Sequence, residues 1–178
     1  MLTKMEKHEI EARAQELLET NGINPENGVD VVQLARKLDF MVGSVAMDDS
    51  EDGFILYDPR VEKIEGMESN KIIGVNSNRN YEDKRFIIAH ELAHYAFRSD
   101  DDTLIAAREH KRGRNEDENW YDYFAACLLM PSKEFKKRFA ELKNNGIKEL
   151  IDGLKDTFGV SDESAYRRML ELNLNPNY

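Results

Sequence analysis

Cysteine is nearly absent from this sequence, and long apolar runs are missing altogether. Cys127 is the only cysteine, so no intramolecular disulfide can form, and we expect the reducing cytoplasm as the compartment. No apolar run is long enough to span a bilayer, and the N-terminal MLTKMEKHEIEARAQ lacks the apolar core of a signal peptide. These absences predict a soluble, intracellular protein.

Positive charge is also scarce, with 25 Lys and Arg against 35 Asp and Glu, for a formal net charge of -10. Such a balance disfavours attraction to phosphate backbones and anionic lipid, so we expect neither membrane binding nor direct nucleic-acid binding. The 178 residues, 40% of them hydrophobic, suffice for one domain with its own core. We expect N-terminal helices and a sheet in 1–80, active-site helices in 81–131 and a helical segment in 132–178.

Hydrophobic periodicity predicts helices at both ends of the chain and strands between them. IEARAQELLE has helical spacing and stops at Asn21-Gly22, and VDVVQLARKL fits a short helix capped by Asp30. Short β-branched and aromatic runs predict strands at 40–47, 53–57 and 71–75. Further helices are expected at 81–98, 116–129, 132–144, 147–158 and 162–172.

The predicted fold class is α+β, with a small, mostly antiparallel three-stranded sheet packed on one face by helices. The C-terminal LKDTFGVSDESAYRRMLEL resembles a helix-turn-helix, with Gly159 at the turn and Ser161 capping the next helix. Arg167 and Arg168 could contact phosphate there. The acidic balance of the chain favours a packing role for this segment instead.

The segment FIIAHELAHYAF, residues 86–97, places three polar residues in a stretch otherwise fit for a core. Helical residues four apart lie one turn above each other, so His90 and His94 can both face one metal ion. Glu91 is rotated off that axis, where it can reach a metal-bound water. Histidines that share this spacing by chance are the alternative, and the apolar helical context favours the metal site.

A hydrolytic zinc site usually has three protein ligands, so a third is expected downstream. Asp100 is one candidate, because it stands where the longer HExxHxxGxxH pattern has its last ligand. That pattern needs a glycine to turn the chain, and this sequence has Phe97 at that position. Glu118 is the stronger candidate, because a helix over NEDENWYDYFAACLLMP places it one turn from Asp122 with small or apolar residues on the same face. Asp122 would accept a hydrogen bond from a ligand imidazole.

Several assignments in this region stay open from the residues alone. Glu116 and Asp117 are register alternatives for the third ligand, and all these acids could instead form a solvated helix start favoured by the helix dipole. Cys127 fits a small core residue better than a nucleophile. Candidates for stabilising an oxyanion are His110, Tyr95, Tyr121 and Tyr123.

Two segments resemble the ImmA/IrrE family of metallo-endopeptidases. They are RFIIAHELAHYAF and ENWYDYFAACLLMP, of which the latter is similar to that family's ExxAN-x-FAA-x-LLMP motif. The resemblance is clearest over residues 71–135. Tyr121 and Asp122 stand in place of the usual Ala-Asn pair: Asp122 can still orient a histidine, whereas Tyr121 adds bulk to the cleft.

The resemblance implies a gluzincin-like zinc site, with His90, His94 and Glu118 as ligands and Glu91 as general base. It also implies a biological task, the cutting of a helix-turn-helix repressor that governs a mobile element such as a phage, or a stress response. The alternative function is a non-catalytic or metal-sensing regulatory protein that acts by binding a repressor. The intact glutamate of HELAH favours the enzyme, since a purely structural site needs no base.

The run KIIGV, residues 71–75, precedes the HELAH helix and is followed by the turn-forming NSNRN. We expect it to form the sheet edge beside the metal, with backbone groups facing the cleft. An extended substrate peptide would add to that edge as one more strand.

Overall fold

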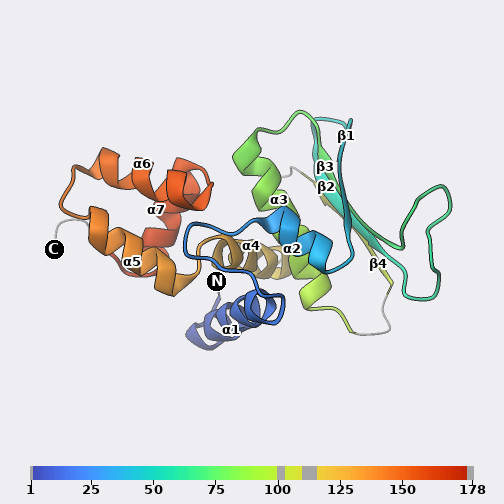
Figure 1. Cartoon of the computed structure of the whole chain (residues 1–178), viewed down its shortest axis with the longest axis horizontal. Helices are drawn as coiled ribbons and strands as arrows, with labels where there is room; N and C mark the ends of the chain where they lie inside the picture. Colours follow the sequence, from blue (N-terminus) through green and yellow to red (C-terminus); the bar gives the residue numbers. More distant parts are fainter. Residues whose placement is uncertain (1, 100–102, 110–115, 176–178) are drawn as a thin grey trace.

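The computed structural model describes residues 2–99, 103–109 and 116–175 of the chain (Figure 1). Among these residues, no helix combines the length and the apolar character needed to cross a bilayer. The elements, in chain order, are α1 (Lys4–Thr20), α2 (Val31–Lys37), β1 (Met41–Val45), β2 (Glu51–Tyr57), β3 (Lys71–Asn76), α3 (Tyr81–Ala96), β4 (Leu104–Glu109), α4 (Glu116–Leu129), α5 (Ser132–Leu142), α6 (Ile147–Phe158) and α7 (Asp162–Glu171).

The strands form one mixed sheet in the order β1-β3-β2-β4. β2 runs antiparallel to β3 and β4, whereas β1 pairs with β3 in parallel. In Figure 1 the helices lie to one side of this sheet, with α5, α6 and α7 at the far end of the molecule. The expected α+β class is confirmed, and all three expected strands form.

The sequence-based prediction missed β4 and did not foresee the parallel pair. The β4 sequence, LIAARE, contains alanines and charged residues, which are depleted in strands. Its extended form is stabilised by pairing with β2, where Leu104 lies opposite Tyr57 and Ile105 opposite Leu56. Pairing between segments distant in the chain is a tertiary effect, so local sequence patterns did not reveal it.

The expectation that KIIGV forms a sheet edge is wrong. β3 is an interior strand, hydrogen-bonded to β1 on one side and to β2 on the other. Every residue of β3 after Lys71 is buried. A continuous apolar run of this kind is typical of a strand covered on both faces. In the described part of the sheet, the edges are β1 and β4.

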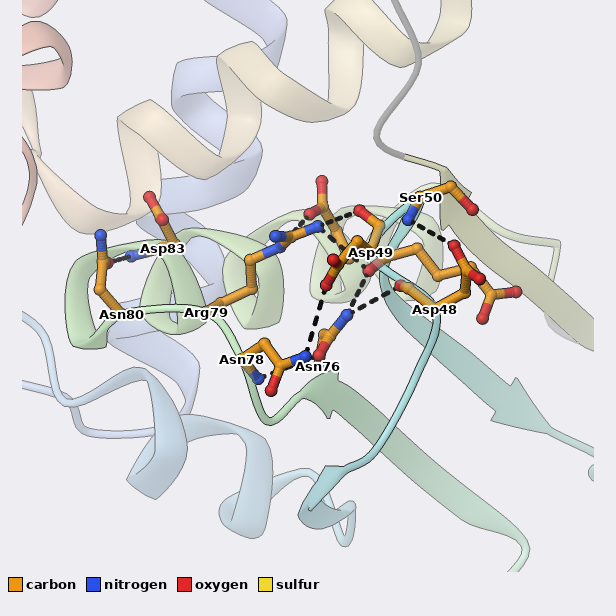
Figure 2. A network of polar contacts seen from close by, with 10 residues as sticks. Asp48, Asp49, Ser50, Asn76, Asn78, Arg79, Asn80 and Asp83 are labelled. Atoms are coloured by element: carbon orange, nitrogen blue, oxygen red, sulfur yellow. Dashed lines mark hydrogen bonds and ion pairs between the residues drawn. The ribbon is translucent and has the colours of Figure 1, made fainter.

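A polar network joins the turn between β1 and β2 to the loop that leads from β3 into α3 (Figure 2). The side-chain amide of Asn76 donates hydrogen bonds to the backbone carbonyls of Asp48 and Glu51, at 3.0 and 2.8 Å. Arg79 pairs with the buried Asp52, with 2.7 Å between Nε and Oδ1. This network fixes the position at which α3 begins.

Helix α3 lies directly against the sheet. Asn80 caps it, because its side-chain oxygen accepts a hydrogen bond of 2.8 Å from the N–H of Asp83. Gly53 on β2 permits the close approach, since a Cβ at that position would lie 2.5 Å from Cγ2 of Ile87. The buried residues of α3 are Ile87, Ile88, Ala89, His90, Glu91, Leu92, Ala93 and Ala96.

Helix α1 holds α3 and α7 through arginine contacts. Arg13 donates two hydrogen bonds, of 3.2 and 3.0 Å, to the carbonyl of Ala96 at the end of α3. Arg168 on α7 is fully buried, donates to the carbonyl of Met130 at 3.1 Å and pairs with Glu11 at 2.8 Å. The packing role expected for the C-terminal segment is therefore confirmed at Arg168.

The predicted turn of this segment is also observed. Gly159 follows α6 with a φ of 61°, in the left-handed region that favours glycine. The hydroxyl oxygen of Ser161 then accepts a hydrogen bond of 3.2 Å from the N–H of Ser164 at the start of α7. The turn between α6 and α7 thus follows from local sequence signals.

Glu11→Ala should lower the free energy of unfolding by about 3 kcal/mol, because it leaves the buried guanidinium of Arg168 without its closest acid. Urea unfolding followed by circular dichroism measures the change. Glu16→Ala is the matched control on the same helix, since its pair with Arg13 is solvent-exposed and should contribute about 1 kcal/mol or less. Equal losses in the two variants would contradict a stabilising role for the buried pair.

Candidate metal centre

The two histidines of HELAH lie on one face of α3, one turn apart. Their ring centroids are 5.2 Å apart, with an angle of 64° between the ring planes. The side chain of His90 is 1% exposed, whereas His94 is partly exposed. One histidine is therefore enclosed by protein, and the other lies nearer to solvent.

Helix α4 supplies the acid that faces these rings. Oε2 of Glu118 lies 3.2 Å from Nε2 of His90, and the Glu118 side chain remains 31% exposed. Each of His90, His94 and Glu118 offers one ligand atom, and these three atoms lie within 4.8 Å of one another. Two imidazoles and a carboxylate at this separation match the donor types of a catalytic zinc site and could hold one ion.

Asp122, one turn after Glu118, contacts the other nitrogen of His90. Its Oδ1 lies 2.9 Å from Nδ1 of His90, and both side chains are buried. A carboxylate only accepts hydrogen bonds, so Nδ1 carries the hydrogen and donates it to Asp122. Nε2 is then the nitrogen that faces Glu118. Such carboxylate–histidine pairs fix the orientation of metal-binding imidazoles.

The electrostatic setting keeps Glu118 negatively charged. When His90 is protonated on both nitrogens, its contact with Glu118 lowers the pKa of that carboxyl below the ordinary 4.5, and positive charge on His90 and His94 acts in the same direction. Partial burial and the nearby Asp122 oppose this shift without reversing it. The imidazole of His90 thus lies between two carboxylates, an arrangement that suits a cation.

Glu91 lies on α3 directly after His90 and is completely buried. A buried carboxylate is costly unless it serves a role or has compensating contacts. Its neighbours on the same helix, Leu92 and Ala93, are also fully buried. The glutamate of HELAH is therefore enclosed on α3 rather than displayed on an outer surface.

Tyr121 contacts both histidine rings, whereas the sequence suggested only that it adds bulk to the cleft or stabilises an oxyanion. Its ring centroid is 4.0 Å from that of His94 and 5.9 Å from that of His90. The other tyrosines considered as oxyanion donors lie elsewhere. Tyr95 packs against the ring of Tyr57, and Tyr123 lies beneath the ammonium of Lys7 on α1.

Other candidates are either buried away from the site or outside the described residues. Cys127 is buried, and burial raises the pKa of its thiol to about 12, which confirms a core residue rather than a nucleophile. Asp100 and His110 lie outside the residues that the structure describes, as do the side chains of Glu116 and Asp117.

Comparison with known proteins agrees with these motifs. Residues 35–170, well over half of the chain, match the peptidase family M78, described as the IrrE N-terminal-like domain. The matched region contains α3 and α4 and excludes α1. A search of curated proteins found no match to the chain. The resemblance seen in the two sequence segments is thereby confirmed, and the chain belongs to the IrrE-like M78 family of metallopeptidases.

Proposed function

We propose that this protein is a zinc-dependent endopeptidase that cleaves a specific protein substrate. The observation that carries the proposal is the buried imidazole of His90, held between Glu118 and Asp122 at 3.2 and 2.9 Å. Membership of a metallopeptidase family supports the same reaction class. His90, His94 and Glu118 are the proposed metal ligands, and Asp122 orients His90.

The proposed mechanism gives each side chain a separate task. Bound zinc would supply Lewis acidity toward the scissile carbonyl. Glu91 accepts a proton from the attacking water and passes it to the leaving amine, as a general base and then a general acid. Asp122 holds the Nδ1 hydrogen of His90, so that Nε2 presents its lone pair to the metal.

A regulatory protein that binds a repressor without cutting it is the alternative candidate. The intact Glu91 of the HELAH segment favours the enzyme. Glu91 directly follows the proposed ligand His90, and a site that only senses or stores a metal gains nothing from a base beside its ligands. The same residue therefore separates the two candidates experimentally.

The substrate that we propose is an extended segment of a helix-turn-helix repressor, in the cytoplasm. The resemblance to the ImmA/IrrE family supports this class of substrate. Since β3 is interior, the strand that can accept a peptide beside α3 is β4, which lies at the sheet edge and contacts α3. An added peptide strand would pair with its backbone, while side-chain contacts select the sequence.

The ligand assignment predicts that the purified protein binds about one divalent ion, preferably zinc. His90→Ala, His94→Ala and Glu118→Ala should each weaken zinc binding by about 100-fold or more, since each removes a ligand. Chelator competition measures the affinity, and Glu163→Ala, at an exposed position of α7, is the control. Full affinity in Glu118→Ala together with its loss in Asp100→Ala would move the third ligand to Asp100.

Glu91→Gln should separate metal binding from chemistry. Glutamine keeps the shape of the side chain but cannot take the proton, so zinc should stay bound while cleavage slows by about 100-fold or more. Metal analysis and a cleavage assay on the same preparation give both quantities. Unchanged cleavage would rule out the proposed base, and the alternative function predicts no cleavage by the wild type either.

Cleavage should be confined to one exposed or transiently unfolded segment of the repressor, with little activity on generic unfolded protein. Incubation with a co-encoded repressor and with casein, followed by mass spectrometry of the products, tests this selectivity. Proline at a backbone-paired residue of the substrate should block cutting, because it removes an N–H donor. Efficient cutting of casein at many sites, with the repressor left whole, would indicate a general peptidase.

A further inference from the structure

Tyr121 lies on α4 between the two acids of the proposed site, three residues after Glu118 and next to Asp122. Its ring is partly exposed and meets the histidines of α3 from the α4 side. The contact with His94 is close, with 4.0 Å between centroids and 44° between ring planes. With His90 the arrangement is edge-on, at 5.9 Å and 80°.

The two imidazoles are thus in contact with adjacent residues of α4. Asp122 hydrogen-bonds to His90 and fixes that ring through its Nδ1 hydrogen. Tyr121 lies against His94, whose other ring neighbour is His90 at a centroid distance of 5.2 Å. A ring in contact with two others has fewer orientations left to adopt than one that faces solvent.

The orientation of an imidazole has to be imposed from outside, because rotation about its χ2 angle is intrinsically broad. The backbone at His94 is fixed by the next residue, Tyr95, whose ring packs against Phe40 and Tyr57 at centroid distances of 5.0 and 5.6 Å. That cluster fixes the backbone position from which the His94 side chain extends. The plane of the His94 ring is set by what lies against it, and Tyr121 is the closest ring.

We propose that Tyr121 is a positioning residue, whose aromatic ring holds the His94 imidazole in the orientation that binds the metal. This inference rests on the ligand set of the proposed function. The ring acts by contact, so the hydroxyl is dispensable for this role. A pre-oriented ligand loses less conformational freedom on binding an ion, which raises metal affinity without adding a ligand.

The test uses the full chain with Tyr121→Phe, Tyr121→Leu and Tyr121→Ala. Phenylalanine keeps the ring, so zinc affinity from chelator competition should stay within about twofold of the wild type. Leucine and alanine remove the ring and should weaken zinc binding by about 10-fold to 100-fold, as loss of an orienting neighbour does.

The visible absorption of bound Co²⁺ provides another measurement that does not depend on activity. Its band positions report ligand geometry, so they should change in Tyr121→Leu and Tyr121→Ala and stay unchanged in Tyr121→Phe. Tyr166→Leu, at a half-exposed tyrosine of α7, is the matched control. Urea unfolding of the metal-free variants identifies any that do not fold, and the folded ones decide the test.

Wild-type zinc affinity and an unchanged Co²⁺ spectrum in Tyr121→Leu or Tyr121→Ala would overturn the role of Tyr121 and leave the proposed ligands intact. Zinc affinity in Tyr121→Phe as weak as in Tyr121→Leu would also overturn this role, because the loss would then come from the missing hydroxyl and not from the missing ring. A wild-type protein that binds neither zinc nor Co²⁺ would instead defeat the proposed function itself.

Discussion

The burial of His90 is the constraint on which the rest of the site depends. An imidazole that is 1% exposed needs partners for both of its nitrogens, and these partners come from one helix, α4. Glu118 and Asp122 are one turn apart, so a single register of α4 against α3 satisfies both contacts. Ala125, fully buried one turn further on, leaves room for the two helices to approach. The packing of α4 against α3 therefore also determines which side chains surround His90.

The rest of the fold holds α3 from three directions. The network around Asn76 and Arg79 fixes its start against the sheet, and the bonds from Arg13 of α1 hold its final carbonyl. Gly53 lets the helix lie close to β2. α1 lies outside the region that matches the M78 family, so part of this support comes from a segment that the family match does not cover.

Sequence reasoning worked where the signal was local. Helix periodicity located the helices, because an amphipathic or buried helix repeats its pattern every few residues. The cap at Asp30 and the turn at Gly159 were readable for the same reason, since each depends on a residue and its immediate neighbours. The strand β4 was missed because its alanines and charges carry little strand preference, and KIIGV was misplaced because strand order has no local signature.

The sequence by itself determined the face of α3 that carries His90 and His94, since the helical period places residues four apart on one side. It also limited the candidates for the third metal ligand to four acids, Asp100, Glu116, Asp117 and Glu118. Only the tertiary structure decided which of the described acids faces His90, because that depends on how α4 crosses α3. The same crossing placed Tyr121 against His94, and the pairing of strands made β4 a sheet edge beside α3. Contacts between segments far apart in the chain arise from packing of the whole core, which no local pattern encodes.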